Sequence, residues 1–250
     1  MATLPFEFAE PVVDEHIEKI GLDVRPTIEI GMEKTRIYDL YRDVNEKYPD
    51  FFDTLQMSPS QFEIKKKFVV PGRGEAELAT FAMTKRGFCV TIPRRIAALD
   101  SELDVPLTDE TDKRIAEVLK IFLKHFPTRK VLRVGKVHDY VFDCGQTDST
   151  LLVAQKFTKI TAPKEIFVRF NLRTEKYNRV FQIEPVLKQG RTEQGTPEIR
   201  GFGIRVSIDF NNCNMSEALD IDQIRVILHS ANDFHGQEAF ELLNNMGGES

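Results

Sequence analysis

The chain has 250 residues, of which 41% are hydrophobic and 29% charged, so it can build a packed core and does not have the composition of a disordered protein. Its net charge of −5 argues against a uniformly basic nucleic-acid-binding protein. No stretch approaches the roughly 18 consecutive apolar residues of a membrane span. The first 15 residues hold four acidic and no basic side chains, which is not the pattern of a signal peptide. We therefore expect a cytoplasmic protein with no membrane association.

The charge is unevenly distributed along the chain. Residues 61–95 contain eight Lys or Arg against three Glu, a local balance of +5. Residues 209–250 contain eight Asp or Glu against Arg225 alone, a local balance of −7. Such blocks usually lie on separate solvated surfaces.

The first predicted elements are a strand near residues 16–24 and a helix over 35–48. Apolar side chains recur in this helix at offsets of 0, 3, 4, 7 and 11, which places them on one face: Ile37, Leu40, Tyr41, Val44 and Tyr48. Pro49 ends the helix because proline has no amide hydrogen to continue the ladder. Three strands follow, separated by glycine-containing turns, at 62–70, 76–84 and 87–93.

A second helix is predicted over residues 110–126, with Pro127 as its stop. Its apolar face has the same offsets and consists of Ile115, Val118, Leu119, Phe122 and Phe126. Thr108 or Asp109 is placed to cap the free amide groups at its start. A strand over 131–142 and a short helix around 148–157 come next.

Alternating apolar and polar side chains predict three further strands, at 165–173, 179–188 and 201–210. In the last of these, five apolar side chains alternate with small or polar ones, which is typical of a strand with one buried and one wet face. The final helix is predicted to begin near Ile221, with Asp220 and Gln223 as a capping box. Gly236 is expected to kink this helix.

The order of these elements indicates the fold. A strand, a helix, three strands and a helix occur twice, with a seam near residues 127–130. We therefore predict an α+β fold of two similar β-α-β-β-β-α halves, residues 1–128 and 129–250, within one compact pseudo-symmetric unit. The halves would form one curved, mainly antiparallel sheet with the helices packed on one face. No residue-level repeat accompanies the element order.

Short motifs near the start, middle and end of the chain carry a resemblance. They are Phe8-Ala9-Glu10-Pro11-Val12-Val13-Asp14-Glu15, then Phe126-Pro127 with the run from Val131 to Tyr140, and Ser207-Ile208-Asp209-Phe210 with the later His229 and Phe240. Together they resemble a sporadically distributed family of conserved bacterial proteins without assigned function. The stretch after Gly135 departs from that family, because it lacks its Arg-Tyr-hydrophobic-Asn run. The resemblance covers nearly the whole chain and implies the fold but no activity. The family's patchy occurrence suggests a bacterial defence or stress system.

The candidate binding residues lie on the wet faces of the predicted strands. Lys65 and Lys67 alternate with Ile64 and Phe68, whereas Lys66 faces the other way or marks a bulge. Basic and amide side chains on an open sheet face can contact phosphates, base edges or an acidic peptide. The candidates are Lys65, Lys67, Arg169, Asn171, Arg173 and Arg205.

The cysteines indicate no redox or metal chemistry. Cys89, Cys144 and Cys213 are far apart and odd in number, so they offer neither a disulfide framework nor a paired-cysteine metal site. Each is expected to be a buried or partly buried free thiol. The sequence indicates no cofactor, no metal and no catalytic motif.

The histidines are isolated in sequence. His229 and Asp233 share a helix face four residues apart, which allows one hydrogen-bonded pair, whereas His235 projects elsewhere and cannot complete a zinc site. We expect each histidine to be a satisfied surface or boundary residue: His16, His125, His138, His229 and His235.

The sequence favours a non-enzymatic binding or scaffold protein that engages another protein through the open sheet face or its free edge. Nucleic-acid recognition through basic surfaces between Lys65 and Arg95 and between Arg169 and Arg205 is an alternative. A second alternative is an enzyme with a site at the seam, using His138 or His229 with a nearby Asp. The sequence specifies neither the partner nor the oligomeric state.

Overall fold

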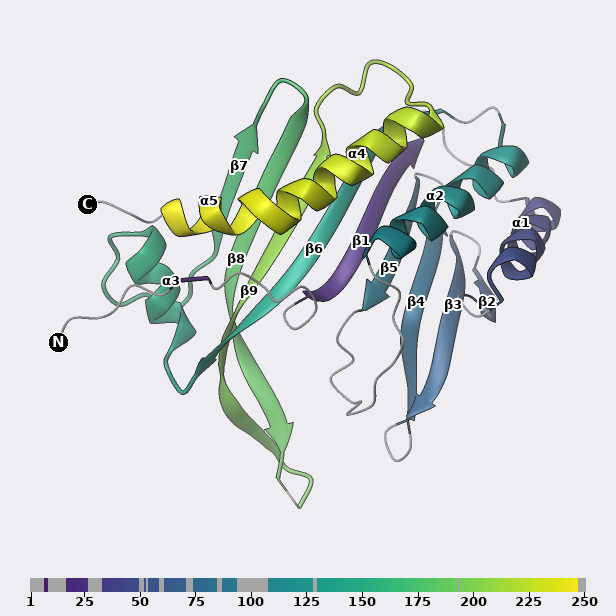
Figure 1. Ribbon diagram of the computed structural model, residues 1–250. Helices are drawn as coiled ribbons and strands as arrows, with labels where there is room; N and C mark the ends of the chain where they lie inside the picture. The colour runs from purple at the N-terminus through teal and green to yellow at the C-terminus, as the bar shows by residue number, and fades with distance from the viewer. Residues whose placement is uncertain are drawn as a thin grey trace.

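The computed structural model describes residues 7–8, 17–26, 33–49, 52, 54–58, 61–70, 74–84, 87–93, 108–127, 130–192 and 194–246. Within these residues the chain is an α+β protein whose strands form one nine-stranded sheet in the order β2-β3-β4-β5-β1-β6-β9-β8-β7 (Figure 1). Every pair of neighbouring strands in this sheet is antiparallel. The two central neighbours, β1 and β6, are far apart in sequence.

All eight predicted strands are present, and β2 is an addition to them. The strands are β1 (Ile17–Pro26), β2 (Thr54–Met57), β3 (Gln61–Val70), β4 (Gly74–Thr84), β5 (Gly87–Pro93), β6 (Val131–Gly145), β7 (Val168–Arg173), β8 (Tyr177–Arg191) and β9 (Pro197–Asn212). The predicted run of three strands between the first two long helices is therefore wrong, because β2 makes it four. The register irregularity beside Lys66 and Lys67 places its extra residue, Leu78, in β4, so the alternation in β3 continues and Lys66 faces the other way from Lys65 and Lys67.

The helices lie on one face of the sheet in the described part of the chain, with α2 and α4 crossing its middle (Figure 1). Their bounds are α1 (Lys34–Lys47), α2 (Thr108–His125), α3 (Ser149–Phe157), α4 (Ile221–Asp233), the π-helical segment η1 (Phe234–Glu238) and α5 (Ala239–Asn245). α2 begins at Thr108, so Thr108 and Asp109 belong to its first turn rather than preceding it.

The core lies between the helices and the sheet. In β6 and β9 the even-numbered side chains face the helices, which is why apolar and polar residues alternate there. Buried side chains on the helices have the periodicity expected for one apolar face. The helix and strand core residues include Ile37, Leu40, Val44, Ile115, Val118, Leu119, Phe122, Tyr140, Phe142, Phe181, Ile183, Ile204, Val206, Ile208, Phe210, Ile224, Leu228 and Phe240.

The last helix begins where the sequence predicts, and its geometry changes at Gly236, where a kink is predicted. The carboxylate of Asp220 accepts from the backbone N–H of Gln223, and the Gln223 side chain accepts from the backbone N–H of Asp220, both at 2.8 Å. This confirms the capping box. At Gly236 the helix does not simply kink: the N–H of Ala239 bonds to the carbonyl of Phe234, five residues earlier, in a π-helical turn.

A residue from the start of the chain packs against its end. Phe8 is buried, and its backbone exchanges two 2.8 Å hydrogen bonds with the side-chain amide of Asn244. Its ring meets Phe142 edge-on at 5.0 Å. None of the described helices is both long and apolar enough to span a membrane.

Candidate functional site

The sheet face opposite the helices carries polar side chains in cross-strand rows. One row runs from Arg169 on β7 through Gln182 and Ser207 to Asp139 on β6. Parallel rows repeat this arrangement because the strands are in continuous register. We call this surface the polar face; its residues are Arg133, Asp139, Asp143, Arg169, Asn171, Arg173, Asn178, Gln182, Glu184, Lys188, Arg205, Ser207, Asp209 and Asn211.

Carboxylates balance the positive charges in the centre of the polar face. A nitrogen of Arg205 lies 2.9 Å from an oxygen of Glu184, and the same distance for Arg133 and Asp209 is 3.1 Å. Lys188 is paired with Asp143. The Arg133 side chain is only 15% exposed, against 41% for Arg205. The centre therefore offers little net positive charge for a partner.

Edge strand β7 differs from that centre. Arg169, Asn171 and Arg173 are exposed, and they extend from the polar face at the margin of the sheet. Within the described residues, none of these three side chains has an ion pair or a side-chain hydrogen bond. Their donors are therefore available to a partner.

The structure does not bring all six predicted site residues together. Arg169, Asn171, Arg173 and Arg205 share the polar face, but Lys65 lies on β3, five strand positions from β9. At about 4.8 Å per strand this separation is roughly 24 Å. The Lys65 side chain is 13% exposed and lies 2.8 Å from Glu63. Lys67 is also on β3, and its side chain falls outside the described residues.

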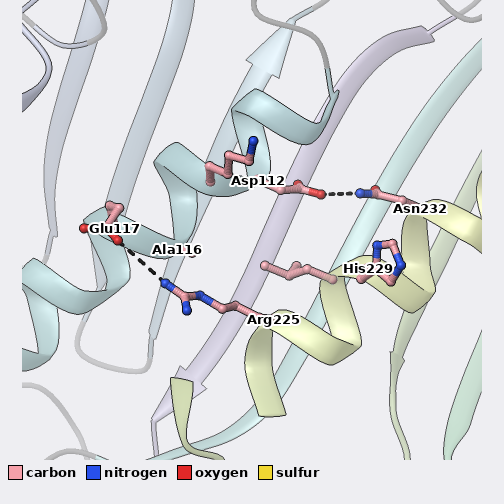
Figure 2. A pocket seen from close by; sticks show the side chains of 8 residues that line it. Asp112, Ala116, Glu117, Arg225, His229 and Asn232 are labelled. Atoms are coloured by element: carbon pink, nitrogen blue, oxygen red, sulfur yellow. Dashed lines mark hydrogen bonds and ion pairs between the residues drawn. The ribbon is translucent and has the colours of Figure 1, made fainter. Parts of the chain in front are cut away.

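A groove of about 530 Å³ lies between α2 and α4 on the helical side (Figure 2). At one end, Asp112 from α2 and Asn232 from α4 point toward one another and share a hydrogen bond. At the other end, Glu117 faces Arg225 at 3.7 Å. Glu117 also accepts a 2.5 Å hydrogen bond from Lys47 on α1, which lowers its pKa.

A buried lysine joins α2 and α4 to the sheet below this groove. Lys136 on β6 is 1% exposed. Its Nζ donates to both carboxylate oxygens of Asp112, at 2.6 and 2.8 Å, and to the amide oxygen of Asn232. An ammonium group has three N–H donors, so these three acceptors satisfy it completely. The arrangement offsets the desolvation of both ions and holds the two helices at a fixed place on β6.

Two histidine rings are buried beside this lysine. His138 and His235 stack with ring centroids 3.8 Å apart, and Nδ1 of His138 lies 2.9 Å from the Tyr140 hydroxyl. The expectation of surface or boundary positions is therefore wrong for both residues, each of which is 3% exposed. His138 occupies an inward position of β6, and the π-helical turn places His235 inside.

The environment keeps the His235 ring neutral. Burial, with a contribution from nearby Lys136, lowers the pKa of His235 to about 3. Neither of its ring nitrogens makes a hydrogen bond of good geometry with a described residue. Burial also raises the pKa of the neighbouring Tyr140 above its ordinary range. At neutral pH the His235 ring is therefore uncharged.

Sequence reasoning missed this buried polar cluster, although part of its signal was present. Val134, Tyr140 and Phe142 mark the inward positions of β6, and Lys136 and His138 fall in the same alternation. A lysine and a histidine at inward positions require buried partners. Nothing in the sequence pattern indicates that a π-helical turn would bring His235 to the same place.

The other histidines assemble no catalytic group in the described residues. Nε2 of His229 lies 3.6 Å from a carboxylate oxygen of Asp233 with both side chains exposed, which is beyond hydrogen-bond distance. Nε2 of His125 lies 2.9 Å from Asp43, and Lys124 together with His125 lowers the pKa of that carboxylate. His16 lies outside the described residues.

The described cysteines are free and partly buried, as predicted for Cys144 and Cys213. Burial raises the pKa of Cys144 to about 11, so its thiol is protonated and weakly nucleophilic at neutral pH. The Cys89 side chain falls outside the described residues. Across the described ranges, no three His, Cys, Asp or Glu side chains converge to hold a metal ion.

Comparison with known protein families finds no match to this chain, and a search of curated proteins finds none either. The resemblance to the bacterial family therefore stays a prediction from the sequence.

Proposed function

We propose that this chain is a non-enzymatic binding protein that engages another protein through the β7 end of its polar face. The observation that carries the proposal is the contrast between paired and available cations on one surface. Arg205 is paired with a carboxylate from a neighbouring strand, whereas Arg169 and Arg173 are exposed without such a partner among the described residues. A partner would gain hydrogen bonds at β7 without first breaking internal ion pairs.

The chemistry of β7 favours an acidic partner surface. Two guanidinium groups flank one amide along a single strand, so the three donors repeat at every second residue. Arginine pairs with carboxylates in a two-point geometry that lysine cannot reproduce. Surface carboxylates spaced like residues on an extended strand would match this array and speed association at low salt.

The alternation of charge across the polar face supports a protein partner over nucleic acid. A nucleic-acid surface needs a continuous set of cations that neutralises successive phosphates. Here Glu184, Asp139 and Asp209 interrupt the cations from strand to strand.

We also infer that the chain is built from two similar halves. Support comes from the sheet order, in which β1 and β6 are central neighbours. Each is followed along the chain by a helix and then by strands that begin at the outer edge of the sheet and return to its centre. This arrangement would present two ends of one sheet to partners, of which β7 forms the more exposed described end.

Site-specific crosslinking in the native host tests the proposed surface. A photoreactive benzoylphenylalanine would replace Asn171 on β7 or, as the control, Val226, which is exposed on α4. We expect one protein to be crosslinked at position 171 and not at 226, identified by mass spectrometry. Equal labelling at both positions contradicts the proposal. Crosslinked nucleic acid at position 171 would replace it with the nucleic-acid alternative.

A further inference from the structure

Strand β8 extends well beyond its neighbour β7. Residues 178–183 of β8 pair with β7, whereas β8 continues to Arg191 and pairs there only with β9 among the described residues. Figure 1 shows the paired ends of β8 and β9 projecting past the rest of the sheet. We call residues 184–191 and 197–203 the arm. Gly195, with φ of +81°, allows the tight turn at its tip.

The outer edge of the arm has unused backbone hydrogen-bonding groups. The Tyr177 carbonyl accepts from Thr174 before β8, and the Lys176 carbonyl accepts from Cys213 after β9. Because these directions alternate along a strand, odd-numbered residues of β8 point toward β7 and even-numbered ones toward β9. The register irregularity near Gln189 places its extra residue in β9, so the alternation in β8 continues.

Four residues of the arm, Pro185, Leu187, Gln189 and Arg191, therefore direct their backbone groups away from β9, where β7 no longer reaches. Pro185 has no N–H to leave unpaired, which suits an edge position. Leu187 and Gln189 each present an N–H and a carbonyl. These groups form a short template for another strand.

A pocket of about 550 Å³ opens beside this edge. Phe167, Leu187 and Phe202 supply its apolar surface, and the pocket also touches the start of α3 at Ser149. Phe167 is 55% exposed and Leu187 is 51% exposed, which are high values for large apolar side chains. Exposed apolar surface that is contiguous and rimmed by polar groups commonly marks a binding site.

The charges around the pocket select an uncharged side chain. The Asp148 carboxylate caps α3 by accepting from the N–H of Thr150 at 2.8 Å, and Glu184 is paired with Arg205. The remaining charged residues at the rim, Lys164 and Glu165, have opposite charges and add no net charge to the pocket. On the side of β7, Arg169 adds an exposed positive charge.

We propose that an extended segment of the partner protein adds to β8 as a strand beside Leu187 and Gln189. An apolar side chain of this segment occupies the pocket lined by Phe167, Leu187 and Phe202. Antiparallel to β8, the segment lies in line with β7 and carries an acidic residue at its C-terminal end, next to Arg169. Main-chain hydrogen bonds supply affinity and the pocket supplies specificity, as in other strand additions. The inference rests on the proposed function for the existence of a partner.

A short synthetic peptide tests the proposed strand addition to β8 before the partner is identified. The probe alternates valine and threonine, ends in two glutamates and carries fluorescein. We expect it to bind and to slow hydrogen exchange at the amides of Leu187 and Gln189. Phe167→Ala should weaken binding about tenfold, the size expected for an exposed anchor residue. Ile160→Ala, a change at another exposed apolar residue outside the pocket, should leave binding unchanged.

Backbone and charge controls sharpen the result. N-methylation of alternate peptide residues, which removes edge donors, should abolish binding, and lysines in place of the glutamates should weaken it. Gln189→Pro removes an N–H that β9 does not use, and its melting temperature shows whether the arm is intact. If the peptide does not bind, or binds without slowing hydrogen exchange at Leu187 and Gln189, the proposed strand addition is wrong.

The two proposals fail in different ways. If charge reversal of Arg169 and Arg173 abolishes partner binding while Phe167→Ala leaves it unchanged, the proposed strand addition to β8 is wrong and the proposed function stands. If the peptide binds as described but charge reversal on β7 does not affect the partner, the proposed function is wrong.

Discussion

Polar residues on the two faces of the sheet are held in opposite ways. On the helical side, Lys136 is enclosed, and the N–H groups of its ammonium donate to the half-buried side chains of Asp112 and Asn232. On the polar face, pairs such as Arg205 and Glu184 are about two-fifths exposed. The comparison teaches that the enclosed cluster governs stability, because a buried charge has no solvent to replace a lost partner. The exposed ion pairs of the polar face can be altered with little effect on the free energy of unfolding.

Lys136→Ala should have the largest effect on the stability of the protein. The change leaves Asp112 and Asn232 without their shared donor below the groove, and it should destabilise the protein by about 3 kcal/mol or more. Urea denaturation measures the free energy of unfolding. The double variant Lys136→Met with Asp112→Leu removes both charges and should recover most of the loss. A loss below about 1 kcal/mol for Lys136→Ala contradicts the structural role of the cluster.

His235 makes the stability of the enclosed face depend on pH. Burial lowers its folded pKa to about 3, below its ordinary value of 6.5, so the unfolded chain binds a proton between these two pH values and the folded chain does not. Stability should therefore fall as the pH drops below 6.5, by about 1.4 kcal/mol per unit for this residue. His235→Leu should remove that part of the slope in urea denaturation from pH 7 to pH 4.5.

The groups packed around His235 define the control for this experiment. Lys136 and the stacked ring of His138 face it from β6. His229, which is 77% exposed, provides the matched change, since His229→Leu should leave the slope as in the unmodified protein. Equal slopes for the unmodified protein and His235→Leu contradict the account.

The capping box of α4 should have an intermediate effect. Asp220→Ala leaves the N–H of Gln223 without its acceptor at the helix start, which should cost about 1 kcal/mol. Thermal unfolding measures the change. Asp222→Ala, at an almost fully exposed position in the first turn, is the control and should have a smaller effect. A larger loss for Asp222→Ala would contradict the assigned cap.

Glu184→Ala on the polar face should have the smallest effect on stability. Its pair with Arg205 is solvent-exposed, so the free energy of unfolding should change by less than about 1 kcal/mol. The same urea titration used for Lys136→Ala gives a direct comparison. A loss as large as that of Lys136→Ala would show that the polar face is structurally essential.

Much of the fold could be predicted from the sequence because its elements have strong periods. The apolar alternation of β9 and the helical spacing from Ile115 to Phe126 identify their elements without tertiary information. Strand β2, with four residues, is too short to show a period. The pairing of β1 with β6 joins segments more than a hundred residues apart, and local patterns do not specify such a contact.

The candidate site was predictable only in part, for a different reason. Arg169, Asn171 and Arg173 follow the alternation of one strand, so their common face could be read from the sequence. Whether a charge is paired depends on neighbouring strands, and only the register brings Glu184 opposite Arg205. For the same reason, Lys65 could not be separated from the other candidates until the strand order was known.

The most direct test of the central claim compares the affinity of the crosslinked partner for two charge-reversed proteins. Arg169→Glu with Arg173→Glu alters β7, and Arg36→Glu with Arg42→Glu makes the same charge change on α1, where both side chains are exposed. Isothermal titration should show that the β7 variant binds at least about tenfold more weakly and that the α1 variant binds normally. Unchanged affinity in the β7 variant would contradict a binding surface at this end of the polar face.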